Sequence, residues 1–177
     1  MILTIGFSKP KNKFFPIFSW LIRLVERTPY SHVYLQWYNK YTETLLTYEA
    51  GGNSVHFKGK RIYEDTLTPI YEYEIEITKE QHKALMKYCF EMAGTNYGIL
   101  QIIGIGYVKF MCCLFNKKKS NPFTDGDKSM VCSELVGNVL SDILLKEHHL
   151  DLDIAGPRAI YEFMEQLEKN GEVTQTK

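Results

Sequence analysis

Apolar and polar residues alternate most regularly over residues 70–77, where tyrosines and isoleucines share one face and glutamates share the other. A period of two is typical of a β-strand with one buried face. Segments 32–38 and 43–50 predict two further strands, joined as a hairpin by a turn at 39–42. A glycine pair ends the second strand, and a short strand is expected at 55–57. The central part of the chain is therefore expected to form an antiparallel sheet.

Apolar residues recur at helical spacing in other segments. Residues 16–27 carry an apolar stripe and predict a helix. Thr78, followed three residues later by Gln81, predicts a capping box at the start of a second helix, which Gly94 ends. A last helix is expected over about 157–171, because a proline suits its first position. These helices would pack on the sheet.

Another helix is expected after residue 128, and it contains Cys132. Ser129 is the predicted N-cap, which places Cys132 at the third position of the helix. Residues 116–128 are rich in Lys, Asn, Asp and Gly and predict an exposed loop directly before it. The stripe expected to face the core follows at helical spacing: Leu135, Val136, Val139, Leu140 and Ile143.

Residues 99–115 are largely apolar, with Lys109 among them. Seventeen residues are at the short limit for a membrane span, and a lysine inside one is costly. We therefore expect a buried helix or a loop that covers a functional site. Peripheral contact with a membrane is the alternative.

Composition fits a single folded domain. The chain has 177 residues, of which 45% are hydrophobic and 24% charged, and its formal net charge is zero. This length is enough to bury a core, and the balanced charge gives no general attraction to nucleic acid. We expect one α+β domain over residues 1–177, with a small antiparallel sheet packed against helices and an insertion or lid at about 99–128.

The cysteines indicate a reducing compartment. Their spacing fits no zinc site, and the two adjacent ones cannot easily bridge each other: Cys89, Cys112, Cys113 and Cys132. No metal or cofactor is predicted. The N-terminus lacks a basic region followed by a long apolar run, so we expect synthesis in a cytoplasm without a secretion signal. A protein carried in a virion or released by lysis would share these features.

Cys132 is the candidate nucleophile. In the first turn of a helix, backbone N–H groups without helical partners favour a negatively charged sulfur. A flexible polar loop just before the helix would leave that sulfur reachable. The alternative is a small core residue with no chemical role, which is the common fate of a lone cysteine on a helix.

His32 is the candidate base, since an imidazole is the usual group to take a proton from a thiol. If the hairpin pairs residues whose numbers sum to 81, His32 lies directly opposite Glu49, with Cβ atoms about 5 Å apart. A carboxylate there would fix the imidazole tautomer and stabilise the imidazolium. A one-residue slip would place the two on opposite faces, leaving Glu49 a solvated strand residue and His32 a structural one.

Tyr97 is the fourth candidate. Its hydroxyl could donate to the oxyanion formed when a thiolate attacks a carbonyl, together with the backbone N–H of Cys132. An aromatic wedge at a turn is the alternative for Tyr97. His56 could replace Glu49 or serve a substrate pocket, although a surface histidine is the simpler expectation.

Four blocks of sequence together resemble the circularly permuted branch of the NlpC-type papain-like superfamily, especially YiiX-like proteins. That branch includes relatives of lecithin:retinol acyltransferase. The blocks are Tyr-Ser-His-Val at 30–33, Tyr-Glu-Ala at 48–50, Gly-x-x-Tyr-Gly at 94–98 and Val-Cys-Ser-Glu-Leu-Val at 131–136. A Gly-Asp pair before a strand, usual in the family, is replaced here by Ile5-Gly6-Phe7-Ser8.

The resemblance implies a permuted papain-like fold with the nucleophile at a helix N-terminus. It also implies roles for the four candidates: Cys132 as nucleophile, His32 as general base, Glu49 as the residue that orients it, and Tyr97 as an aid to the oxyanion. A compact domain without a cell-wall-binding module suits a bacterial or phage protein.

These features predict a cysteine hydrolase that cleaves an amide bond through an acyl-enzyme on Cys132. The resemblance implies two substrate classes. Peptidoglycan peptides and other amides are the first, and lipid esters, hydrolysed or transferred at a membrane surface, are the second. The apolar residues 99–115 favour the lipid class. A non-catalytic virion or binding protein on the same scaffold is the alternative of another kind.

Overall fold

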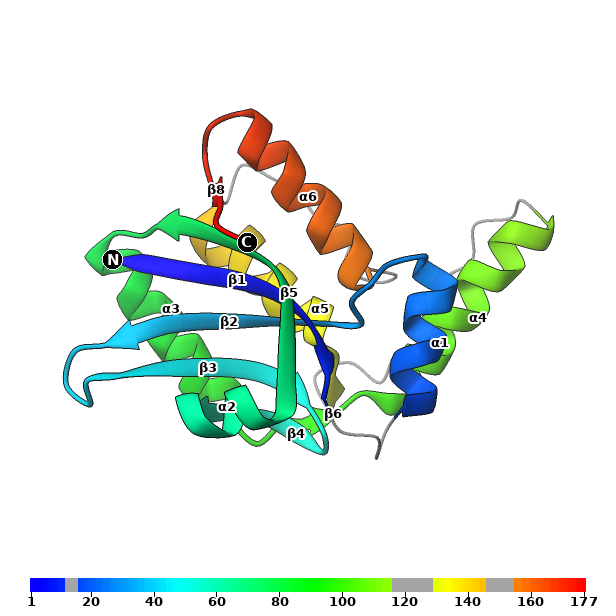
Figure 1. Cartoon of the computed structure of the whole chain (residues 1–177), viewed down its shortest axis with the longest axis horizontal. Coiled ribbons are helices and arrows are strands. Elements are labelled where there is room, and N and C mark those ends of the chain that lie inside the picture. Colours follow the sequence, from blue (N-terminus) through cyan, green and yellow to red (C-terminus); the bar gives the residue numbers. More distant parts are fainter. Residues whose placement is uncertain (12–15, 116–128, 146–154) are drawn as a thin grey trace.

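The computed structural model describes residues 1–11, 16–115, 129–145 and 155–177 (Figure 1). Its strands are β1 (Ile2–Pro10), β2 (His32–Asn39), β3 (Thr44–Gly51), β4 (Ser54–Gly59), β5 (Leu67–Glu76), β6 (Asn96–Tyr97), β7 (Ser129–Met130) and β8 (Thr174–Gln175). They form one eight-stranded sheet in the order β7-β6-β4-β3-β2-β1-β5-β8. Neighbours are antiparallel except β6 and β7, which are parallel. The sheet is therefore larger than expected and mixed.

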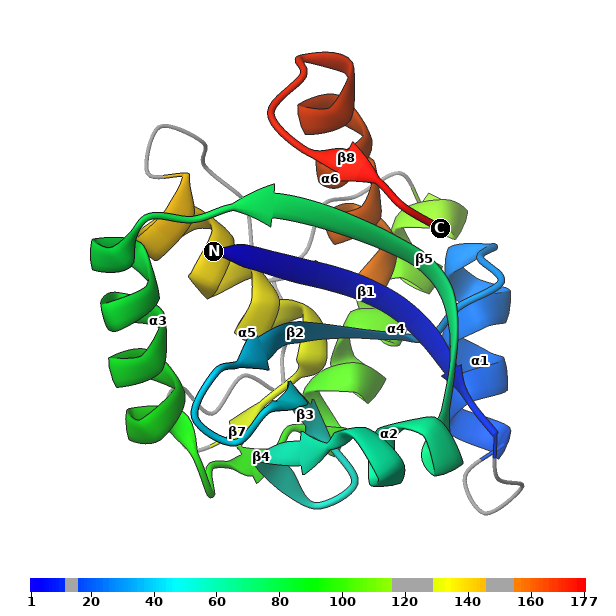
Figure 2. The ribbon, with the colours of Figure 1, turned by 60° about the vertical axis from the view of Figure 1, so that its left-hand side comes forward.

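Helices pack on both sides of this curled sheet (Figures 1 and 2). They are α1 (Pro16–Glu26), α2 (Lys60–Thr66), α3 (Lys79–Met92), α4 (Ile99–Phe115), α5 (Cys132–Asn138), the π-helix η2 (Val139–Leu144) and α6 (Pro157–Lys169). The main core lies between the sheet and α3, α5, η2 and α6. A smaller apolar cluster under α2 covers the other face of β2.

The α+β class is confirmed, and so are most of the predicted elements. Strands β2 to β5 and helices α1, α3 and α6 lie where the hydrophobic pattern places them. The capping box of α3 is present: the Gln81 N–H donates to Thr78 Oγ1 at 3.1 Å, and the Thr78 N–H donates to Gln81 Oε1 at 2.9 Å. The predicted loop at 116–128 lies outside the described residues.

The pattern did not predict β1, although this strand lies between β2 and β5 near the middle of the sheet. Leu3, Ile5 and Phe7 alternate along it and are fully buried in the main core. Between them, Gly6 provides space for the ring of Tyr34, because a Cβ at Gly6 would lie only 2.0 Å from Tyr34 Cζ. The glycine that weakens the strand pattern is thus the one that this close packing requires.

The register expected for the β2–β3 hairpin is wrong by two residues. Tyr38 pairs with Leu45, so paired residue numbers sum to 83 instead of 81. Asn39 remains in the strand while its Oδ1 accepts the backbone N–H of Tyr41 at 2.8 Å, and Glu43 takes the left-handed conformation with φ 50°. The turn is thereby displaced by one residue. Because the displacement of the pairing is even, every side chain keeps its face of the sheet.

Helix α4 is only partly buried, which corrects the expectation of a buried segment. Gln101, Ile105 and Val108 are buried, whereas Leu100 is 63% and Ile103 44% exposed. Figures 1 and 2 show α4 beside α1 at one end of the molecule. Within the described residues, none of the helices combines the length and apolar character needed to cross a membrane.

We expect Gly6→Ala to lower the free energy of unfolding by about 2 kcal/mol, because the new methyl group must displace a buried tyrosine ring. That ring is held by two hydrogen bonds: the Tyr34 hydroxyl donates to Glu72 Oε1 at 2.8 Å and accepts from the Tyr63 hydroxyl at 2.6 Å. Urea unfolding measures the change. Gly59→Ala is the matched control, since nothing lies within 4 Å of a Cβ there. Equal stability of the two variants would contradict the close packing at Gly6.

Candidate active site

Cys132 is the first residue of α5, directly after the short strand β7. Val131 is the N-cap, with an extended backbone at φ −97° and ψ 161°, and its N–H donates to Glu134 Oε2 at 3.4 Å. The expected cap, Ser129, instead lies in β7 paired with Asn96, so the predicted third position of Cys132 is wrong. At the first position, the Cys132 N–H belongs to the helix turn that lacks intrahelical acceptors.

His32 begins β2 and contacts Glu49 of β3, with 3.1 Å between His32 Nε2 and Glu49 Oε2. The contact forms diagonally across the strands, because the register differs from the expected one by two residues. Gly51 lies beside this contact: a Cβ there would lie 3.3 Å from Glu49 Oε1, slightly closer than usual, and 3.5 Å from His32 Cε1, an ordinary contact distance. The predicted pair is thus brought together by a different register from the one expected.

The side chain of Cys132 lies close enough to the imidazole of His32 to raise the pKa of the ring. Since Nε2 faces Glu49, Nδ1 is the ring nitrogen left for the sulfur. Burial alone would lower the pKa of His32, but the carboxylate of Glu49 and the contact with Cys132 raise it to about 10. The ring is therefore a strongly held imidazolium between the sulfur of Cys132 and the carboxylate of Glu49.

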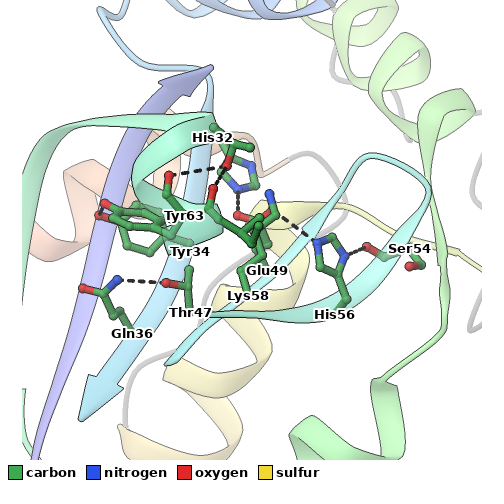
Figure 3. Close-up of polar contacts among 11 residues, drawn as sticks. His32, Tyr34, Gln36, Thr47, Glu49, Ser54, His56, Lys58 and Tyr63 are labelled. Atoms are coloured by element: carbon green, nitrogen blue, oxygen red, sulfur yellow. Dashed lines mark hydrogen bonds and ion pairs between the residues drawn. The ribbon is translucent and has the colours of Figure 1, made fainter. Parts of the chain in front are cut away.

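Glu49 is 2% exposed and carries cationic neighbours on both oxygens. Lys58 Nζ contacts Oε1, and His56 Nε2 lies 3.6 Å from the same oxygen. Burial alone would raise the pKa of Glu49, but His32 and Lys58 hold it at about 2. Figure 3 shows His32, Glu49, Lys58 and His56 on neighbouring strands, with Lys58 and His32 directed at the carboxylate.

Tyr97 lies beside the sulfur because β6 pairs in parallel with β7. Tyr97 pairs with Met130, and the Gly98 N–H donates to the Met130 carbonyl at 3.1 Å. The Tyr97 hydroxyl lies close enough to the side chain of Cys132 for the sulfur to affect its pKa. Burial and the nearby sulfur raise the pKa of Tyr97 well above its usual value, so the hydroxyl stays a proton donor.

Two cavities meet near Tyr97. One, of about 50 Å³, is almost wholly apolar and lies between α1, α4 and the start of α5, where Cys132 forms part of its wall. The other, of about 260 Å³ and open to solvent, passes over His32, Glu49 and Lys58. Tyr97, Ile22 and Ile102 line both. Cys132 therefore borders the small apolar cavity, and the larger cavity lies on the His32 side of the site.

All four predicted residues, Cys132, His32, Glu49 and Tyr97, therefore meet in one place. Sequence reasoning missed Lys58 and gave His56 a surface position. The available signal was the alternation of β4, which places both residues on the same face of that strand. Direct pairing of Glu49 with His56 then brings that face to the carboxylate.

Comparison with known proteins shows similarity in fold. No protein-family model matches the chain, and no curated protein matches it in sequence. The crystal structure described as metalloprotein yiiX from Escherichia coli O157:H7 superposes with a TM-score of 0.56 at 15% identity, over 98% of this chain and 94% of that one. The fold of this chain is thus YiiX-like. In the described part of the chain, no group of three or more His, Cys, Asp or Glu side chains is placed to hold a metal ion.

The raised pKa of His32 has a consequence for stability. A group that binds its proton more tightly in the folded state contributes stability that is full below its unfolded pKa, near 6.5 here, and is lost as pH rises through its folded pKa, near 10. We expect the free energy of unfolding of the unmodified protein to fall over this range, and His32→Gln to reduce the fall. Urea unfolding at several pH values measures it.

The matched control is His82→Gln. Burial lowers the pKa of His82, so this residue loses its proton below the range of pH 6.5 to 10 over which His32 acts. Its replacement should therefore keep the pH dependence of the unmodified protein. If His32→Gln and the unmodified protein lost stability in parallel above neutral pH, a raised His32 pKa would be contradicted.

Proposed function

We propose that the protein is a cysteine hydrolase that cleaves an amide bond through an acyl-enzyme on Cys132. The observation that carries this proposal is the bridging position of His32, whose ring contacts Cys132 and, at 3.1 Å, the buried carboxylate of Glu49. Nucleophilic catalysis by a thiol needs a base within hydrogen-bonding reach and a group that orients that base. The chain supplies both.

In the first half of the reaction, the Cys132 sulfur, its proton held by His32, attacks the carbonyl carbon. The carbonyl oxygen becomes negatively charged, and the Tyr97 hydroxyl and the Cys132 N–H donate to it. As the C–N bond breaks, the imidazolium of His32 gives its proton to the departing amine. The products of this half are a thioester on Cys132 and a neutral His32.

In the second half, a water molecule attacks the thioester while His32 takes its proton. The C–S bond breaks, the acid leaves, and the sulfur again shares the proton held by His32. Glu49 keeps one tautomer and one orientation of the ring through both halves. The reaction as written uses water and this chain's own residues.

Peptide amides, such as those of peptidoglycan, are the first substrate class, because the larger cavity brings polar side chains to the His32 side of the sulfur. A lipid ester, hydrolysed or transferred at a membrane surface, is the second candidate. The apolar cavity beside Cys132 favours it. So do exposed residues at one end of the molecule, including Trp20 at 55% and Leu100 at 63%.

Alkylation by iodoacetamide at pH 6 tests the nucleophile. We expect Cys132 to react about a hundredfold faster than free cysteine, because ordinary thiols are almost wholly protonated there. Cys89 is fully buried and burial raises its pKa to about 12, so it should remain unlabelled in the folded protein. His32→Ala should remove most of the advantage of Cys132. Mass spectrometry of each peptide gives the rates, and uniformly slow labelling would instead favour a non-catalytic scaffold.

Co-sedimentation with phospholipid vesicles tests the second candidate. If a membrane supplies the substrate, Leu100→Ser combined with Ile103→Ser should reduce the bound fraction severalfold. Tyr41→Ser is the matched control, since Tyr41 is 98% exposed and lies in the β2–β3 turn, far from α4 (Figure 1). Equal binding of both variants would remove α4 from the case for a lipid substrate.

A further inference from the structure

The Glu49 carboxylate divides its two oxygens between different partners. Oε2 faces His32, whereas Oε1 contacts Lys58 and lies 3.6 Å from His56 Nε2. The Lys58 side chain is 17% exposed, so this contact is largely shielded from water. Such shielding makes the charge of Lys58 effective at His32, on the opposite side of the same carboxylate.

We propose that Lys58 is a positioning residue that fixes the Glu49 carboxylate against His32 and offsets part of its negative charge. This inference rests on the proposed function, because the charge of Glu49 needs to be partly offset only if His32 must release a proton during the reaction. The chemistry of the site gives the reason. A buried carboxylate with no other cation would hold the imidazolium so strongly that the ring would be a poor acid for the departing amine.

Strand geometry selects Lys58 for this role. Glu49 pairs directly with His56 and Thr47 pairs with Lys58, so the lysine reaches the carboxylate diagonally along one face of the sheet. Thr47 itself is occupied, since its Oγ1 accepts from Gln36 Nε2 at 2.8 Å. His56 is a weaker partner. Its Nδ1 donates to the Ser54 carbonyl at 2.9 Å, and its side chain is 34% exposed.

The charges of the site balance when Lys58 is included. Before attack, the proposed thiolate and Glu49 are anions, and His32 and Lys58 are cations. After acylation, Cys132 and His32 are neutral, and Glu49 and Lys58 still cancel. The site therefore avoids a net buried charge in both states. The ionisable groups that face His32 and Glu49 come from five elements: Glu49, His56, Lys58, Tyr63, Tyr97 and Cys132.

Titration of the His32 ring by NMR tests the proposal without any substrate. The titration is made in Cys132→Ala protein, so that the thiol does not titrate with the ring. Lys58→Met removes a positive charge that opposes the imidazolium, so the His32 midpoint should rise by about 1 pH unit. Lys58→Arg keeps the charge and should restore the original midpoint. A purely structural lysine would not give this pattern.

Lys60→Met is the matched control. Lys60 lies two residues further on, is 57% exposed, and pairs with Glu64 instead of Glu49, so the His32 midpoint should not move. Should Lys58→Met fail to fold, Lys58→Gln carries the same expectation. An unchanged midpoint in the folded, uncharged variant would overturn the proposal. A different outcome would separate the two proposals. If Lys58→Met raises the His32 midpoint in the Cys132→Ala protein, but Cys132 of the unmodified protein reacts slowly with iodoacetamide, the hydrolase is refuted and the electrostatic role of Lys58 stands.

Discussion

A carboxylate buried in a protein interior must be paired, and the site depends on how Glu49 meets this requirement. Its partners come from the strands on either side of it, because β2, β3 and β4 are consecutive antiparallel neighbours. That arrangement brings His32 to one oxygen and Lys58 to the other. The cost of removing the charge from water is offset only while both contacts hold. The carboxylate therefore ties the orientation of His32 to the integrity of the sheet.

Much of the fold and of the candidate site could be predicted from the sequence, because the patterns that indicate them lie within short segments of the chain. Alternation located β5, the hairpin pattern and the glycine pair after it located β2 to β4, and helical spacing with a capping box located α3. The contact between His32 and Glu49 was predicted correctly although the assumed register was wrong. The register differs by two residues, and a shift by an even number of residues leaves both side chains on the same face of the sheet. Residue type and face were thus enough to identify the pair, whereas the turn conformation that sets the register was not evident.

The remaining features depend on contacts between distant residues. β1 lies centrally, but Gly6 interrupts its pattern, and the reason for that glycine is a ring on another strand. Tyr97 reaches Cys132 through a parallel pair of two-residue strands, too short for any periodicity to indicate. Ser129 looked like a cap because the pairing of β7 was unknown. Lys58 was overlooked since its role is defined by a buried carboxylate, and burial is a property of the folded chain.

The pairing of β6 with β7 has a consequence for how proteins with this fold can diverge. The chain leaves the site after Tyr97 and returns at Ser129, and these two points are held together by neighbouring strands. What lies between them includes α4, whose residue Ile102 borders both cavities. Because the cost of closing a longer loop grows only slowly with its length, this segment can be lengthened or replaced while its two ends stay fixed. Changes in this segment can therefore reshape the walls of the two cavities without disturbing the strands that bring Tyr97 to Cys132.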